Sequence, residues 1–215
     1  MGRGEKMKKY RIIAVVVLVV CFYSLSLGQG LSEKGVIGGI NYASFGGPDA
    51  DDGDMDPKRL LRYAVGGFAT FNLNGNLIIR PEVHYSMKGV KYEESEDGME
   101  LLAEMRMNYL DIPVLFVFTP QPKLMAYAGP MVGVYLSGET YAKFSFGGES
   151  ESDTEDIDKE EIKNPDFGAV VGVGYGLTDK ISVHARYSMG LITVDDADDV
   201  DIKHNSLQLL LSTTF

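Results

Sequence analysis

Cysteine, basic residues and long apolar runs are all scarce in this 215-residue sequence. The single cysteine, Cys21, has no second cysteine to pair with, so the chain forms no internal disulfide. The 20 Lys and Arg are outnumbered by 31 Asp and Glu, which gives a net charge of −11. This charge argues against a nucleic-acid partner, because phosphate backbones are bound mainly by Lys and Arg. The longest apolar run, residues 12–22, is shorter than the ~20 residues that a transmembrane helix requires.

The N-terminal segment predicts export. Basic residues precede the apolar run, and small residues, including Ser26 and Gly28, follow it. A basic start, a short apolar middle and small residues before a cleavage site are typical of a secretory signal peptide. We therefore expect residues 1–28 to be a cleaved signal peptide and residues 29–215 to be the mature domain. The alternative, a retained membrane anchor, is disfavoured by the shortness of the apolar run.

The mature chain is more acidic than the whole sequence. Residues 1–28 hold five of the 20 basic residues and one of the 31 acidic residues, so the remainder carries a net charge of −15. The acids are also concentrated, because 25 of the 31 fall in residues 45–60, 89–104, 147–166 and 190–203. The sequence between these segments is nearly free of carboxylates. We therefore expect strands there, and exposed loops in the four acidic segments.

The segments between the acidic stretches alternate in polarity with a period of two, as strands do when their two faces meet different environments. Residues 77–88 show this most clearly, with apolar side chains at most odd positions and Arg80, Glu82, His84 and Lys88 at even positions. The C-terminal residues repeat the pattern. Eight strands are predicted, at residues 35–45, 61–72, 77–88, 105–118, 124–146, 167–177, 181–189 and 204–215.

Three short connections alternate with the four acidic segments, at residues 72–76, 119–123 and 178–180. The first contains Asn74-Gly75, a strong signal for a hairpin turn. Long loops at one end and tight turns at the other are the layout of a transmembrane barrel. Such a sheet must close, because a free edge in lipid would leave backbone groups unpaired. The sequence therefore predicts an all-β, eight-stranded antiparallel up-and-down barrel with long extracellular loops and short periplasmic turns.

Two features of the strands stay open. Asp111 and Pro113 interrupt the strand at residues 105–118, and we expect a β-bulge near Asp111 that re-aims its faces. Alternation also does not say which face points inward. A soluble, lipocalin-like barrel with apolar residues inside is therefore the alternative to a membrane barrel.

A family resemblance follows from the order of these strands. The stretches that carry it are GVIGGINYASF (35–45), RPEVHYSMKG (80–89), NYLDIPVLFVF (108–118), AYAGPMVGVYLSG (126–138), DFGAVVGVGYGL (166–177), ARYSMGL (185–191) and the terminal STTF. Nearly all of the mature chain resembles the PorT-like outer-membrane barrels, which are small Gram-negative surface proteins. The resemblance implies a barrel but no single role, since members differ and one supports a secretion system. Phe215 also resembles the aromatic terminus that barrel-assembly machinery recognises.

Seven polar residues of the predicted strands are expected to face the lumen: Arg80, Glu82, His84, Lys88, Arg106, His184 and Arg186. An eight-stranded barrel is just wide enough inside to be filled by side chains. We therefore expect a structural network of mutually satisfied charges, with a narrow binding cleft as the alternative. His84 beside Ser86 invites a hydrolase interpretation, but no third group is evident to orient the pair. We expect no catalytic residue and no cofactor.

The acidic segments offer only weak candidates for a metal site. Carboxylate oxygens are ligands that calcium prefers, and the candidates are Asp49, Asp51, Asp52, Asp54 and Asp56. However, Gly53 is out of phase for an EF-hand loop, because Pro48 stands where the first Asp should be. A solvated anionic loop is favoured over calcium binding.

Two function classes remain. The favoured one is a non-enzymatic outer-membrane barrel with a structural, surface-interaction or secretion-support role and acidic extracellular loops. The alternative is a small outer-membrane enzyme or a narrow transport pore. The expected partners are the lipid bilayer and lipopolysaccharide, the barrel-assembly machinery during biogenesis, and an unidentified envelope protein. A monomer is expected.

The first testable prediction concerns processing. The mature protein should begin at Gln29 and fractionate with the outer membrane, because residues 1–28 have the layout of a signal peptide. N-terminal sequencing of the purified protein checks this. Retention of residues 12–22 would contradict it.

Overall fold

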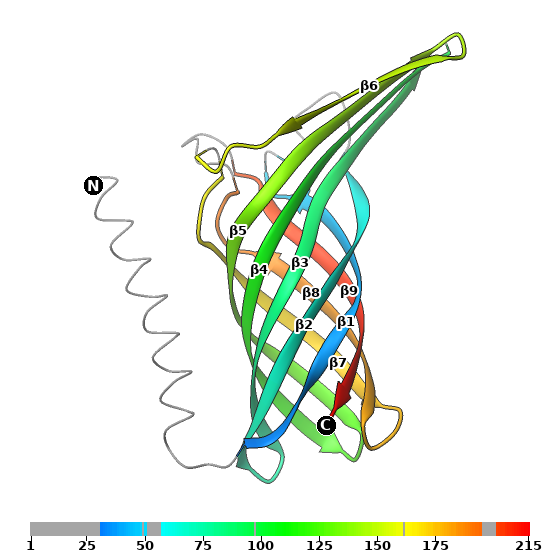
Figure 1. The fold of residues 1–215 in the computed structure, drawn as a ribbon. Coiled ribbons are helices and arrows are strands. Elements are labelled where there is room, and N and C mark those ends of the chain that lie inside the picture. Colours follow the sequence, from blue (N-terminus) through cyan, green and yellow to red (C-terminus); the bar gives the residue numbers. More distant parts are fainter. Residues whose placement is uncertain (1–30, 49, 51–56, 97, 161, 195–200) are drawn as a thin grey trace, which may run out of the picture.

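The computed structural model describes residues 31–48, 50, 57–96, 98–160, 162–194 and 201–215. The expected signal peptide, residues 1–28, lies outside them. Within the described residues the chain folds into nine strands of one antiparallel sheet (Figure 1). Their bounds are β1 Leu31–Gly46, β2 Lys58–Asn74, β3 Leu77–Glu96, β4 Met99–Gln121, β5 Leu124–Phe146, β6 Glu149–Asp156, β7 Asp166–Gly176, β8 Ile181–Gly190 and β9 Lys203–Thr214. The described residues include no helix that is long and apolar enough to cross a membrane.

Eight of the strands close into a barrel. The sheet order is β4-β3-β2-β1-β9-β8-β7-β5-β6, and β4 also pairs with β5, which joins the two ends of the ring. The first and last barrel strands, β1 and β9, pair without a register shift from Gly35↔Thr214 to Gly46↔Lys203. The predicted eight-stranded antiparallel barrel is confirmed. β6 is the ninth strand and lies outside the ring, on the upper part of β5.

The two ends of the barrel differ as the sequence predicts. Tight connections join β2 to β3, β4 to β5 and β7 to β8 at one end, which we call the turn end. β1 begins and β9 finishes at this same end (Figure 1). The remaining connections lie at the opposite end, the loop end. The up-and-down topology is therefore the one expected from three short turns alternating with acidic segments.

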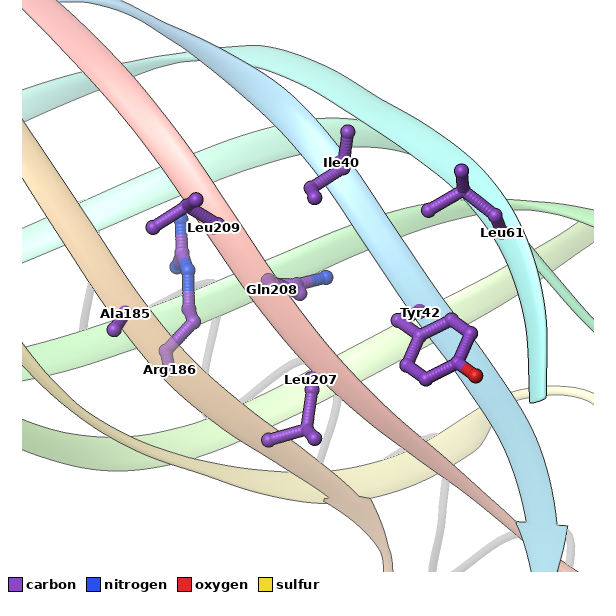
Figure 2. Close-up of a pocket in the computed structure, with 8 residues that line it drawn as sticks. All are labelled: Ile40, Tyr42, Leu61, Ala185, Arg186, Leu207, Gln208 and Leu209. Atoms are coloured by element: carbon purple, nitrogen blue, oxygen red, sulfur yellow. The ribbon is translucent and has the colours of Figure 1, made fainter.

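The outer wall of the barrel is apolar, whereas the lumen holds charged and polar side chains together with apolar clusters. Val83, Val173 and Leu209 on three different strands are each about half exposed on the outer wall. Figure 2 shows a shallow pocket in this wall, where Ile40 and Tyr42 of β1 stand beside Leu207 and Leu209 of β9, while Arg186 and Gln208 extend to the other side of the sheet. The soluble lipocalin-like alternative requires apolar residues inside and polar residues outside, and it is wrong because this outer wall is apolar.

Beyond the loop end, four strands continue as an arm. It consists of residues 89–96 of β3, 99–106 of β4, 138–146 of β5 and the whole of β6 (Figure 1). The prediction of an exposed loop at residues 89–104 is therefore wrong, because this segment is a hairpin paired from Gly89↔Arg106 to Glu96↔Met99. Part of the acidic segment at residues 147–166 is likewise β6.

The high density of acidic residues hides the alternation of side chains in this segment. Within the hairpin, Tyr92 lies between Lys91 and Glu93, and Met105 lies between Glu104 and Arg106. The acids are also partly compensated, since Lys91 and Lys58 contact Glu93. Two faces of different polarity and a regular ladder of backbone hydrogen bonds are sufficient for strands.

The expected β-bulge near Asp111 is not on β4. The pairing of β4 with β3 keeps one register from Leu77↔Phe118 to Glu96↔Met99. The irregularity lies on β5 instead, where Asn108 pairs with Ser137 and Tyr109 pairs with Tyr135, so that Leu136 is the extra residue. The lumen-facing positions of β4 are therefore odd-numbered throughout the barrel, including Asp111 itself.

The second testable prediction concerns the outer wall. Val83→Arg should destabilise the barrel by about 2–4 kcal/mol, because a cation near the bilayer midplane loses its hydration. Val83→Leu should be tolerated, since Val83 is 49% exposed and has room to grow outward. Urea unfolding in lipid vesicles measures the free energies.

A matched control lies on the same side of the sheet but beyond the barrel. Leu102 faces outward on the arm, paired with Glu93 and Lys143, so Leu102→Arg should change the free energy of unfolding by less than about 0.5 kcal/mol. An equal loss in both arginine variants would mean that the lipid boundary lies elsewhere.

Candidate functional site in the barrel lumen

The lower lumen, toward the turn end, is organised around one carboxylate. Glu82 Oε1 lies 2.8 Å from Arg80 Nε, and Glu82 Oε2 lies 2.7 Å from Arg186 Nη1 and 2.9 Å from His84 Nε2. All four side chains are at most 6% exposed. The Arg80 guanidinium also stacks on the ring of Phe68, at 3.7 Å from its centroid. One acid thus compensates two buried cations.

This cluster bridges opposite walls of the barrel. Arg80, Glu82 and His84 are alternate residues of β3, so a period of two places them all on the inner face. Arg186 comes from β8, which is separated from β3 by β2, β1 and β9 in the ring. The contact between Glu82 and Arg186 is possible because an eight-stranded lumen is narrow enough for two side chains to span it.

Glycines on β7 make room for these side chains. A Cβ added to Gly172 would lie 2.7 Å from both the Tyr127 ring and the Cβ of Arg186. Tyr127 and His184 occupy the space that results, with ring centroids 5.9 Å apart, and His184 Nε2 lies 2.9 Å from the hydroxyl of Ser212. The glycine-rich inner face of β7 therefore serves the packing of larger neighbours.

The middle of the lumen holds a neutral polar layer. Asn41 Nδ2 donates to the backbone oxygen of Met87 at 2.7 Å and, more weakly, to Ser86 Oγ at 3.4 Å. Gln208 Nε2 donates to Asn41 Oδ1 at 3.4 Å. Ser86 therefore accepts from an amide, whereas His84 contacts Glu82. The structure does not join these two as a nucleophile and its base.

A second charged cluster lies toward the loop end. Lys88 Nζ is 2.9 Å from Asp111 Oδ1 and 3.8 Å from Asp166 Oδ2, and it lies 4.5 Å from the centroid of the Tyr109 ring. The Tyr109 hydroxyl in turn lies 3.1 Å from His204 Nε2. Here one cation faces two acids, the reverse of the ratio around Glu82.

Apolar side chains close the loop end above this cluster. Tyr109 and Tyr135 meet edge to face, with ring centroids 5.5 Å apart. Residues from the connections pack onto them, namely Ala50, Ile162 and Val194. A second apolar cluster fills the lumen nearer the turn end and comprises Leu115, Val117, Tyr127, Met131 and Val170. The described lumen is thus occupied by side chains at successive levels.

Six of the seven residues expected in the lumen lie there, in two separate groups. Arg80, Glu82, His84 and Arg186 form the lower cluster with His184 close by, and Lys88 belongs to the upper one.

Arg106 is the exception, and the expectation that it faces the lumen is corrected. Its side chain is 29% exposed on the outer face of the arm, where it contacts Glu104 at 2.8 Å and Glu139 at 3.0 Å. The physical reason is the unbroken register of β4, which gives the inner face to the odd-numbered Met107 and Tyr109.

The upper cluster contains residues that sequence reasoning did not select. The sequence predicts an irregularity at Asp111, although a carboxylate within an apolar strand is itself a signal for an inward position. Asp166 and His204 stand at the ends of their strands, where alternation is too short to assign a face. The calcium candidates Asp49, Asp51, Asp52, Asp54 and Asp56 lie outside the described residues. Within the described residues, no three His, Cys, Asp or Glu are placed to hold a metal ion.

An apolar outer wall, a closed ring of eight strands and a lumen packed with paired charges define a transmembrane β-barrel. Comparison with known families agrees, because the model of the outer membrane protein beta-barrel domain matches residues 28–196. The chain belongs to this family and is located in the cell outer membrane. No functionally curated protein matches the chain.

Solved structures with a similar fold are more distant. The attachment invasion locus protein Ail of Yersinia pestis is 15% identical with a TM-score of 0.46, covering 86% of this chain and 100% of that chain. Neisserial surface protein A is also 15% identical with a TM-score of 0.46, covering 87% and 100%. OprG of Pseudomonas aeruginosa is 12% identical with a TM-score of 0.32, covering 87% and 98%.

The third testable prediction concerns the lower cluster. Glu82→Gln should lower the free energy of unfolding by about 3–5 kcal/mol, because it leaves two buried guanidinium groups without a counter-charge. Adding Arg80→Gln should recover part of the loss, since it removes one of those charges. Urea titrations in lipid vesicles give the values.

The control for this prediction is Glu139→Gln. Glu139 also accepts from an arginine, Arg106, but its side chain is 41% exposed, so the change should cost less than about 1 kcal/mol. Equal losses at the two sites would show that the contacts of Glu82 are not the ones that hold the lumen.

Proposed function

We propose that this protein is a non-conducting, non-enzymatic scaffold that displays its β3–β6 arm on the cell surface for interaction with another molecule. The observation that carries the proposal is the contrast between lumen and arm. The described lumen is filled by paired charges and apolar clusters, whereas the arm extends beyond the barrel and presents exposed side chains (Figure 1).

The proposal includes the orientation and the route of export. Residues 1–28 serve as the signal peptide, and the barrel-assembly machinery recognises the terminal Phe215, which is 71% exposed. The turn end then lies in the periplasm and the arm lies outside the cell, where lipopolysaccharide surrounds the barrel. Both strand termini at the turn end (Figure 1) support this arrangement.

A finer family assignment is also proposed. The stretches NYLDIPVLFVF and AYAGPMVGVYLSG, which carry the resemblance to PorT-like barrels, form the adjacent strands β4 and β5. The bulge at Leu136 lies within the second of them. Support of a secretion system, the role of one PorT-like member, is one form of the proposed surface interaction of the arm.

The fourth testable prediction separates a scaffold from a pore. The purified protein should show no stepwise conductance in planar bilayers, because side chains occupy the lumen at several levels. An armless variant should behave identically. In this variant, an Asn-Gly turn replaces residues 91–104 and joins Val90 to Met105, which are paired in the structure. A second Asn-Gly turn replaces residues 140–155 and joins the paired Glu139 and Asp156.

Folding of the armless variant is checked by the shift in gel mobility between heated and unheated samples. Because the ring closes through β4–β5 pairs below the arm, the variant should retain the shift. Ion current through the intact protein would contradict the scaffold and support a narrow pore.

A further inference from the structure

The two faces of the arm differ in composition. Cross-strand pairing aligns one residue of each strand in rows across the inner face, which continues the lumen wall. Four rows run from the tip toward the barrel: Glu96–Met99–Phe146–Glu149, Glu94–Leu101–Phe144–Glu151, Tyr92–Ala103–Ala142–Asp153 and Val90–Met105–Thr140–Glu155. In the two rows nearest the tip, a pair of apolar side chains is flanked by a carboxylate on each side.

The apolar stripe along the inner face is exposed to solvent. Met99 is 42% exposed, Phe144 is 47% exposed and Phe146 is 57% exposed. These residues belong to the arm portions of β4 and β5, and the arm extends beyond the barrel (Figure 1). Exposed aromatic side chains that neither lipid nor protein covers are typical of an interaction surface.

On the outer face, three of the acids are paired with cations of the same face. Glu93 contacts Lys91 at 2.8 Å and Lys58 at 3.3 Å, and Arg106 contacts Glu104 and Glu139. The hydrogen bonds from Lys91 and Lys58 lower the pKa of Glu93, and the bond to Glu93 raises the pKa of Lys91. These contacts offset part of the negative charge of this face.

The inner-face acids have no such compensation. Among the described residues, no Lys, Arg or His lies within ion-pair distance of the carboxylates that flank the stripe, which are Glu94, Glu96, Glu149, Glu151, Asp153 and Glu155. Their negative charges therefore remain available to a cationic ligand, and they line both sides of an apolar stripe.

The dimensions of this face suit a helix. β3 and β6 are three strand spacings apart, about 14 Å, and a helix with its side chains is about 10 Å across. The four rows cover about 20 Å along the strands, which corresponds to a helix of about 13 residues. Long Lys or Arg side chains at the flanks of such a helix can reach outward to the carboxylates while their stems cover apolar surface.

We infer that the inner face of the arm binds a basic amphipathic helix of another polypeptide. The apolar side of the helix lies on Met99, Leu101, Phe144 and Phe146, and its flanking Lys and Arg side chains pair with the carboxylates of β3 and β6. This inference rests on the proposed surface-interaction function and names the chemistry of the partner.

The test uses the full mature protein in phosphatidylcholine nanodiscs, with empty nanodiscs as background. The probe is a fluorescent 14-residue peptide of Leu and Lys arranged with a helical period, and the comparison peptide has the same composition in scrambled order. Fluorescence anisotropy should show binding of the periodic peptide, weakened by added salt because the carboxylate contacts are solvent-exposed.

Two pairs of matched variants separate the faces of the arm. Phe144→Ser with Phe146→Ser should weaken binding by about tenfold or more, whereas Leu102→Ser with Tyr141→Ser on the outer face should leave it within about twofold. The charge variants remove four acids from either face. Glu94, Glu96, Glu149 and Glu151 are changed to Gln in one, and Glu93, Glu100, Glu104 and Glu139 in the other.

The inner-face charge variant should lose binding while the outer-face variant retains it, although both change the net charge equally. Equal effects from the two faces, or no binding of the periodic peptide above empty nanodiscs, would overturn the inference. The proposed function is tested separately by the conductance measurement. A barrel that neither conducts ions nor binds the peptide would contradict this inference about the partner but would remain consistent with the proposed scaffold function. Gel mobility before and after heating confirms that each variant is folded.

Discussion

A strand in a bilayer has no water to satisfy its backbone N–H and C=O groups, so a sheet that spans lipid must have no free edge. In this protein the condition is met where β1 pairs with β9 from Gly35 to Gly46 without a register shift, and where β4 meets β5. Closure with eight strands fixes the interior at about the width of packed side chains. The polar lumen, the apolar wall and the absence of space for a wide channel all follow from that one requirement.

A lumen this narrow brings charged side chains from opposite walls into direct contact. Glu82 forms ion pairs with Arg80 and Arg186, whereas Lys88 faces Asp111 and Asp166. With the histidines neutral, the lower cluster has one excess positive charge and the upper cluster one excess negative charge. Neither is balanced alone, so the charges of the lumen compensate each other only along the barrel axis. Both clusters also join opposite or distant strands, which ties the walls of the barrel together from inside.

Much of this architecture could be predicted from the sequence, because alternation survives wherever a strand separates lipid from lumen. The turn at Asn74-Gly75 and the inward side of Glu82 depend only on local pattern. The face to which Arg106 points could not be predicted, because it depends on whether the β-bulge lies on β4 or at Leu136 of the partner strand β5. The contact between Glu82 and Arg186 also could not be predicted from the sequence, because it joins residues 104 positions apart in the chain and on opposite walls of the barrel.

Side chains also alternate between two faces in the arm, but there the outer face is the polar one, in contrast to the barrel. Within the bilayer, the face that looks away from the lumen must be apolar, as at Val83. Above the loop end, that face is free to be polar, and Glu93 and Arg106 are paired with neighbours on it. The apolar stripe has moved to the opposite face, where Phe144 and Phe146 continue the inner side of the wall without a lumen to enclose them. The β3–β4 pairing keeps one register from the barrel into the arm, although the apolar side chains change from the outer face to the inner face. Lipid therefore does not determine the polarity of the arm, and the proposed binding of another polypeptide explains its exposed apolar stripe.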